Sequence, residues 1–254
     1  MHRIKGLIFD LGNTLMCMHG EWEKVIRGGA EDLAQFLVGQ GFKLDPAVVV
    51  DDFISLRKSL SAKAREELVE YSAEYALATL LARWGHRDVS SQVIEEATLA
   101  LFSDEESRWH PYPEAEATLR QLSEMGYRLA LFSNATDDPL IQRLVDKGGF
   151  RRWLDPALSS AGVGIRKPDP KVFEGVLDQW RLSPTQVLMI GDMLEFDIAG
   201  AHNVGMKGIL AAWDLYPNYA EGCDHIVPEA RVESMSELVE AVIALDGQIA
   251  KGGR

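Results

Sequence analysis

Hydrophobic and polar positions divide the chain into two stretches of different periodicity. Between about residues 21 and 107, apolar side chains recur at helical spacing and no segment alternates as a strand would. Four amphipathic stripes lie there, with apolar positions at Val25, Leu33, Phe36 and Leu37; at Val49, Phe53, Leu56 and Leu60; at Tyr71, Tyr75, Leu77 and Leu81; and at Val93, Ile94, Ala97 and Leu101. Helices of this length predict a small helical bundle.

Beyond residue 108, short apolar runs alternate with amphipathic helical segments. The pattern predicts strands at 127–132, 156–160, 187–190, 207–212 and 225–227, and helices at 114–124, 170–180, 198–203 and 235–245. Such alternation is typical of a parallel sheet covered by helices on both faces. The apolar run at 5–9 must join this sheet, because alone it would have no partner strand. The helical block is therefore expected to be an insertion after the first strand of an α/β fold.

Composition excludes several classes of function. The chain has 254 residues, with 26 basic and 39 acidic side chains, so its net charge is −13. This charge disfavours nucleic acid or anionic membrane as a partner. No apolar stretch is long enough to span a bilayer, and the start of the chain is too short in apolar residues for a secretory signal. Cys17 and Cys223 lie far apart without metal-ligand spacing, as expected of free thiols in a cytoplasmic protein. We expect a monomer or homodimer.

Polar side chains cluster where the expected strands end. They are Asp10, the pair Ser133 and Asn134, Lys167, and the pair Gly191 and Asp192 followed by Asp197. The carboxyl ends of parallel strands line one crevice in a doubly wound sheet, so these groups are expected to meet. Three carboxylates in one place repel one another, and a lysine and a divalent cation of the Mg²⁺ type would relieve that repulsion.

Such a cluster suits phosphoryl transfer. Asp10 would attack phosphorus and form an aspartyl-phosphate, while Mg²⁺ would bridge Asp10 and a phosphate oxygen with Asp192 as a further ligand. Ser133 and Lys167 would neutralise the charge on the phosphoryl oxygens in the transition state.

Four short motifs carry a resemblance to a known family. They are Phe-Asp-Leu-Gly-Asn-Thr-Leu at 9–15, Phe-Ser-Asn at 132–134, Arg-Lys-Pro-Asp-Pro at 166–170, and Ile-Gly-Asp at 190–192 with Asp197. Their order and spacing resemble those of the haloacid dehalogenase-like hydrolase superfamily. The resemblance implies a Rossmann-like core formed by residues 1–15 plus 109–254, with a helical cap domain at 16–108.

The resemblance also implies roles for individual residues. Asp10 would be the nucleophile, the Gly12 carbonyl and Asp192 metal ligands, and Ser133 and Lys167 phosphate-binding groups. Asp197 could bind the metal directly, act through water, or hold Lys167. Nearby loop residues are candidates for substrate contact or for shaping the loop, and these are Asn13, Thr14 and Asn134. The cap would select the substrate, with Trp22, Arg27, Arg65 and Tyr71 as residues of interest.

Position 12 departs from the pattern of the family's phosphatases. They usually carry a second Asp there, which protonates the leaving group, whereas this chain has Gly12. General acid–base catalysis typically contributes about 10²- to 10⁴-fold. One interpretation is a Mg²⁺-dependent phosphohydrolase of a small phosphorylated metabolite with a good leaving group, or with His19 or Glu21 as the proton donor.

Two alternatives remain open from the sequence. The first is a hydrolytic 2-haloacid dehalogenase, since dehalogenases of the family also lack that acid and need no metal. The second is a catalytically weak member that only binds a phosphorylated ligand or a protein. The intact motif of Gly191, Asp192 and Asp197 favours the phosphohydrolase, because it supplies what a metal site needs.

Overall fold

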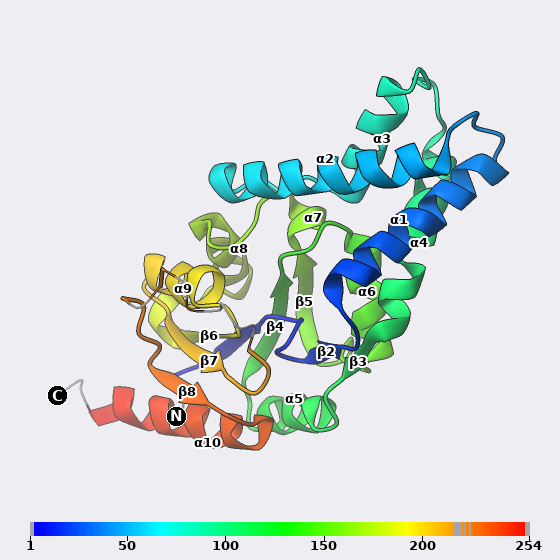
Figure 1. The fold of residues 1–254 in the computed structure, drawn as a ribbon. Coiled ribbons are helices and arrows are strands. Elements are labelled where there is room, and N and C mark those ends of the chain that lie inside the picture. Colours follow the sequence, from blue (N-terminus) through cyan, green and yellow to red (C-terminus); the bar gives the residue numbers. More distant parts are fainter. Residues whose placement is uncertain (1–2, 216–219, 221, 224, 252–254) are drawn as a thin grey trace.

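The computed structural model describes residues 3–215, 220, 222–223 and 225–251, and it has an α/β architecture (Figure 1). Six parallel strands form the central sheet in the order β5-β4-β1-β6-β7-β8. Their bounds are β1 Gly6–Phe9, β4 Arg128–Ser133, β5 Leu154–Ser159, β6 Val187–Gly191, β7 Lys207–Ala211 and β8 Ala230–Val232. The α/β class with inserted helices is therefore confirmed.

Helices cover both faces of the sheet. The helices of the core are α5 Ala115–Glu124, α6 Asp138–Lys147, α8 Pro170–Trp180, α9 Ala199–Asn203 and α10 Met235–Lys251. Leu7 and Phe9 of β1 share one buried cluster with residues of α5, α6 and α10, whereas Ile8 belongs to a second cluster with α8 and α9. Successive strand residues point to opposite faces, so a strand buried on both sides has no polar positions. This explains the continuous apolar run of β1.

A helical layer lies between β1 and β4 in the chain and stands to one side of the sheet, away from α5 and α10 (Figure 1). It consists of α1 Trp22–Gly39, α2 Pro46–Glu67, α3 Ala73–Arg83 and α4 Ser91–Arg108. Asp45 caps α2, since its carboxylate accepts from the Ala47 N–H at 2.9 Å. Gly29 of α1 lies against the Leu101 carbonyl of α4, which lets these two helices pack closely.

A two-stranded ribbon joins the helical layer to the sheet. β2 Met16–Met18 pairs antiparallel with β3 Trp109–Pro111, so the chain enters and leaves the layer at one place. Three-residue strands carry too little alternation to stand out in a sequence, and we did not expect them.

One predicted strand is wrong. Residues 225–227 form no strand, and the last strand is β8 at Ala230–Val232. Ile226 turns back to donate to the Cys223 carbonyl, and Val227 is 71% exposed, so this apolar pair does not enter the sheet.

The helix expected at 198–203 is preceded by a π-helical turn, η2 Leu194–Ile198. The short elements α7 Ser160–Val163 and η1 Pro184–Gln186 were not assigned from the sequence. Within the described part, none of the helices combines the length and hydropathy that crossing a bilayer requires.

Candidate active site

Residues from five segments converge on one cavity of about 350 Å³ at the carboxyl edge of the sheet. Asp10 follows β1, Ser133 ends β4 and Asp192 follows β6, so the order of strands brings them together. Lys167 and Asp197 come from a loop and from η2, and they line the same cavity. The five groups predicted from strand ends are therefore neighbours in space.

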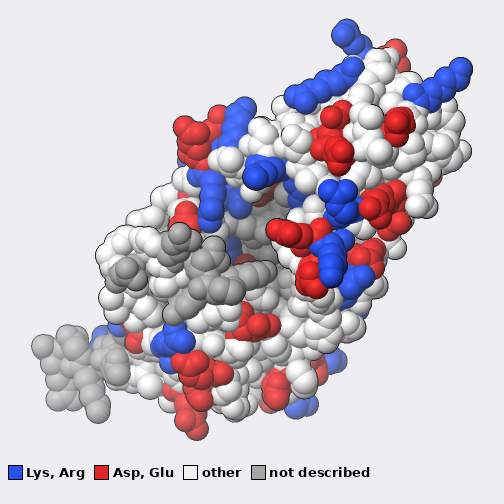
Figure 2. All heavy atoms as spheres, viewed as in Figure 1, with Lys and Arg blue, Asp and Glu red and all other residues white. Residues whose placement is uncertain are grey.

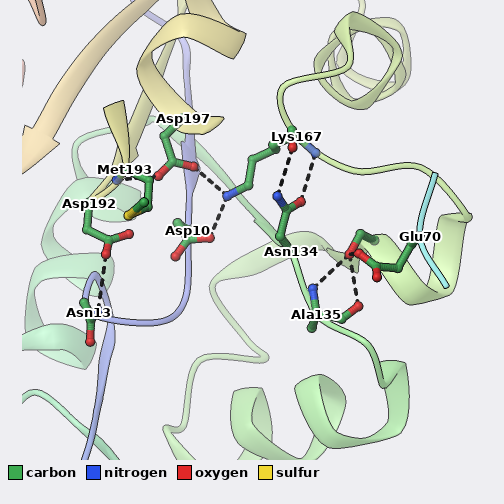
Figure 3. A network of polar contacts seen from close by, with 10 residues as sticks. Asp10, Asn13, Glu70, Asn134, Ala135, Lys167, Asp192, Met193 and Asp197 are labelled. Atoms are coloured by element: carbon green, nitrogen blue, oxygen red, sulfur yellow. Dashed lines mark hydrogen bonds and ion pairs between the residues drawn. The ribbon is translucent and has the colours of Figure 1, made fainter. Parts of the chain in front are cut away.

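Lys167 lies between two carboxylates (Figure 3). Its Nζ donates to Asp10 Oδ1 and to Asp197 Oδ1, both at 2.6 Å, and the whole residue is 1% exposed. Burial disfavours the ammonium, but the charges of Asp10 and Asp197 outweigh it and hold the pKa of Lys167 above its ordinary value. Lys167 is thus a fixed cation beside Asp10.

Asn134 holds the backbone of Lys167. Its Nδ2 donates to the Lys167 carbonyl at 3.0 Å, and its Oδ1 accepts from the Lys167 N–H at 2.9 Å. Both polar atoms of the amide are thereby used, so Asn134 contacts the loop more directly than it could contact a ligand.

Asp197 uses both of its oxygens within the protein. While Oδ1 accepts from Lys167, Oδ2 accepts from the Met193 N–H at 3.0 Å across the π-helical turn. A Cβ at Gly191 would come within 2.3 Å of the Asp197 carboxyl carbon, so only glycine fits there. This close approach explains why the motif at 190–192 has glycine at position 191.

Asp192 and Asn13 form the other side of the cluster. Asn13 adopts a left-handed backbone conformation with φ of 51°, and its Nδ2 donates to Asp192 Oδ2 at 3.2 Å. Burial, together with repulsion from Asp10 and Asp197, raises the pKa of Asp192 to about 8. Burial likewise raises the pKa of Asp10 to about 6, with Asp197 adding to it and Lys167 opposing it.

Apart from burial, negative charge exceeds positive charge in this cluster. Asp10, Asp192 and Asp197 carry three charges when ionised, and Lys167 returns one, which leaves two uncompensated in a buried place. A divalent cation would cancel them, and Asp10, Asp192 and the Gly12 carbonyl are oxygen donors of the kind Mg²⁺ takes. Within the described part, no set of three His, Cys, Asp or Glu side chains is itself arranged as a metal site. A metal here would therefore also need backbone and water ligands.

The two hydroxyl groups of the motifs differ in position. Ser133 lines the cavity beside Asp10. Thr14 is fully buried, is absent from the cavity wall, and its Oγ1 has no hydrogen-bond partner among the described residues. Thr14 therefore does not shape the loop through a side-chain hydrogen bond to any described residue, and the turn is held by backbone bonds such as that from the Thr14 N–H to the Leu11 carbonyl.

Position 12 faces an aromatic ring. A Cβ built on Gly12 would lie 3.1 Å from Cη2 of Trp109, so the indole takes the space where a larger side chain would start. Trp109 Nε1 donates to Glu105 Oε1 at 3.3 Å, and both residues line the cavity. Burial raises the pKa of Glu105, with Arg57 opposing the shift. Sequence reasoning missed this carboxylate.

The two proton donors suggested by the sequence lie elsewhere. The ring of His19 stacks on that of His110 with 4.7 Å between centroids, and Glu21 pairs with Lys24 at 2.7 Å. Neither His19 nor Glu21 lines the cavity. Their position gives no support to a role in proton transfer.

The helical layer forms the far wall of the cavity. Trp22, Arg57 and Phe102 line it, and a second cavity of about 780 Å³ continues between α1 and α2. Figure 2 shows the surface hollowed between the helical layer and the sheet, with Lys and Arg side chains along the upper border of the hollow. The other residues of interest line only the second cavity, and these are Arg27, Arg65 and Tyr71.

Comparisons with known proteins agree with this geometry. The sequence model of the haloacid dehalogenase-like hydrolases matches residues 4–205. The chain is 24% identical over 241 residues to a glyceraldehyde 3-phosphate phosphatase of Methanopyrus kandleri, covering 94% of this chain and 97% of that one. It is 33% identical over 137 residues to a phosphoserine phosphatase of Thermus thermophilus, covering 54% and 53% of the two chains.

Among solved structures, a 2-haloacid dehalogenase from Pseudomonas syringae superposes with a TM-score of 0.71 at 24% identity. That alignment covers 95% of this chain and 99% of the other. Since the family model spans most of the chain and includes all four motifs, this protein belongs to the haloacid dehalogenase-like hydrolases.

Proposed function

We propose that this protein hydrolyses phosphate monoesters of a small metabolite, with Mg²⁺ and through a phosphorylated Asp10. The observation that carries the proposal is the buried contact of Lys167 with Asp10 at 2.6 Å, in a cavity that Ser133 and Asp192 share. The relatives named as phosphatases of glyceraldehyde 3-phosphate and phosphoserine support the substrate class.

The chain's own groups account for the steps. A carboxylate oxygen of Asp10 attacks phosphorus, the ester P–O bond breaks, and the alcohol oxygen leaves with the bonding electrons. Lys167 and the Ser133 hydroxyl donate to the phosphoryl oxygens as their charge redistributes. Water then attacks phosphorus, and the bond to Asp10 breaks with its electrons returning to the carboxylate. The proton that the water loses passes through solvent to the departed alcohol oxygen, and inorganic phosphate leaves.

Asp197 acts in this scheme as a positioning residue. Its two oxygens already accept hydrogen bonds from Lys167 and Met193, so we assign it to the orientation of Lys167 ahead of direct metal binding. Mg²⁺ would be held by Asp10, Asp192 and the Gly12 carbonyl, and when bound it would supply charge stabilisation at the phosphoryl group.

The helical layer would serve as the cap of this site. We propose that residues 16–108 form a domain that closes over Asp10 and excludes water, hinged on the ribbon of β2 and β3. Because Gly12 supplies no acid, we further propose that the substrate has a leaving group that needs little protonation, such as a sugar 1-phosphate, an acyl phosphate or an aryl phosphate.

A second candidate is hydrolysis of 2-haloacids. The missing carboxylate at Gly12 favours it, because cleavage of a carbon–halogen bond needs no proton for the leaving group. The excess negative charge of Asp10, Asp192 and Asp197 argues against it, since that reaction has no use for a metal site.

The test measures phosphate release from aryl, acyl and alkyl phosphates, and chloride release from 2-chloropropionate, with Mg²⁺ and with EDTA. We expect phosphate release that requires Mg²⁺ and is lost in Asp10→Asn, whereas Asp88→Asn, at an exposed carboxylate before α4, retains it. Turnover that persists in EDTA, or chloride release that exceeds phosphate release, would contradict the proposal.

A further inference from the structure

One basic side chain of the helical layer faces the same cavity as the nucleophile. Arg57, in the middle of α2, lines both the cavity that contains Asp10 and the larger one behind it. It is half-buried, and burial tends to lower the pKa of its guanidinium while Glu105 and Glu70 tend to raise it. Arginine stays protonated in such surroundings, so a full positive charge lies in the wall opposite Asp10.

The guanidinium of Arg57 has no hydrogen bond and no ion pair with any residue that the structure describes. Its nearest assigned contact is the ring of Trp22, whose centroid lies 6.0 Å away. Arginine carries five N–H donors. Because Arg57 is half-buried and lines both cavities, these donors are open to a molecule that enters them.

The two carboxylates that raise the pKa of Arg57, those of Glu70 and Glu105, have other hydrogen-bond partners. Glu70 accepts from Ser160 Oγ at 2.7 Å and lies 3.5 Å from Arg166 Nη1, and Glu105 accepts from Trp109. They stabilise the charge of Arg57 from a distance and leave its N–H groups free.

Arg166 adds a second donor to the same wall. It precedes Lys167, lines both cavities, and its buried Nε has no partner in the described part of the chain. The larger cavity, which both arginines line, has five basic side chains and two carboxylates in its wall, against a net charge of −13 for the whole protein.

We infer that Arg57, flanked by Arg166, binds a second anionic group of the substrate, remote from the phosphoryl group that Asp10 receives. This inference rests on the proposed function, because it assigns the part of the substrate that is not transferred. Carboxylate and phosphate both match a guanidinium fork, so the shared chemistry is an oxyanion. The cavity of about 350 Å³ equals the liquid volume of roughly a dozen waters, which suits a compact substrate with its two anions at opposite ends.

The experiment compares esters that differ only in the remote group. One pair is 3-carboxyphenyl phosphate and 3-carbamoylphenyl phosphate, and a second, with the same kind of leaving group, is benzene-1,3-diyl bisphosphate and 3-hydroxyphenyl phosphate. The wild type, Arg57→Met, Arg57→Lys and the control Arg87→Met are assayed by kcat/KM with Mg²⁺. Arg87 is an exposed arginine of the same helical layer that lines neither cavity.

We expect the wild type to prefer the charged member of at least one pair by about 10- to 100-fold, as a charged hydrogen bond allows. Arg57→Met should raise KM for the charged member at least about 10-fold more than for the neutral member, Arg57→Lys should restore part of the preference, and Arg87→Met should match the wild type. The favoured pair then tells carboxylate from phosphate.

Two other results would overturn the inference while the proposed function stands. One is equal hydrolysis of charged and neutral members by the wild type, and the other is an equal loss on both members in Arg57→Met, which would assign Arg57 a structural role. Absence of Mg²⁺-dependent hydrolysis of every ester would instead overturn the proposed function, and the inference with it.

Discussion

Replacing Gly12 by aspartate tests whether the missing acid limits the reaction and whether the fold has room for it. A Cβ at position 12 would lie 3.1 Å from Cη2 and 3.6 Å from Cζ3 of Trp109, so the indole must shift by a few tenths of an ångström before the carboxyl group is even placed. Overpacking of this kind costs about 1–3 kcal/mol. The shift would also strain the 3.3 Å hydrogen bond from Trp109 Nε1 to Glu105.

We therefore expect Gly12→Asp alone to lower stability by about 1–3 kcal/mol without accelerating hydrolysis of an alkyl phosphate. Combined with Trp109→Phe, which removes the outer ring atoms, the same substitution should raise that rate. The upper limit is about 10²- to 10⁴-fold, the usual contribution of a positioned acid, which corresponds to about 3–5 kcal/mol of transition-state stabilisation. An aryl phosphate should respond little, because its leaving group needs little protonation.

Urea denaturation measures the stabilities, and phosphate release from ethyl phosphate and 4-nitrophenyl phosphate measures the rates. Trp109→Phe alone is the control, since it removes the indole N–H without adding an acid. A single Gly12→Asp variant of full stability and higher alkyl phosphatase activity would show that Trp109 is no obstacle. A double variant without any gain on the alkyl ester would show that the absent carboxylate is not what limits this enzyme.

Two further glycines give sharp expectations. In Gly191→Ala, the new Cβ would come within 2.3 Å of the Asp197 carboxyl carbon, so the Asp197 side chain should move away from Lys167. Mg²⁺-dependent turnover should then fall at least about 10-fold while the circular dichroism spectrum is retained. Unchanged turnover would show that Asp197 does not position Lys167. In Gly29→Ala, the Cβ would lie 2.3 Å from the Leu101 carbonyl oxygen, so urea denaturation should show a free energy of unfolding lower by about 1–3 kcal/mol. Gly39 lies on the same helix with open space around it, so Gly39→Ala should be neutral or stabilising by up to about 1 kcal/mol. Equal effects of the two substitutions would contradict the packing of α1 on α4.

The parts of the site that lie on strand ends could be predicted from the sequence. Asp10, Ser133 and Asp192 each follow an apolar run, and the geometry of parallel sheets brings such positions to one edge. Lys167 was expected to meet these groups as well, but its simultaneous contact with Asp10 and Asp197 has no signature in the apolar pattern. It depends on the path of a loop and on a π-helical turn, neither of which has a periodicity to read.

The pattern of apolar and polar residues also could not predict the ribbon of β2 and β3 or the position of the last strand. A three-residue strand pairs through its backbone, so its side chains need not alternate. Ile226 and Val227 look like a strand because both are β-branched, yet a turn at Cys223 and the exposure of Val227 take them out of the sheet. Local propensity was outweighed there by tertiary context.

Arg57 and Glu105, two residues of the cavity wall that the apolar pattern did not single out, share one property. Arg57 lies four residues after Phe53 and three before Leu60, so it occupies the apolar stripe of α2. Glu105 likewise continues the stripe of Ala97 and Leu101 in α4 at intervals of four. Counting only apolar positions makes such charges look like the end of a stripe. A charge at a position that faces inward costs free energy, and here both charges face the cavity of Asp10. A charge that interrupts an apolar stripe therefore points to a cavity wall, just as a polar residue at a strand end points to the edge of a parallel sheet.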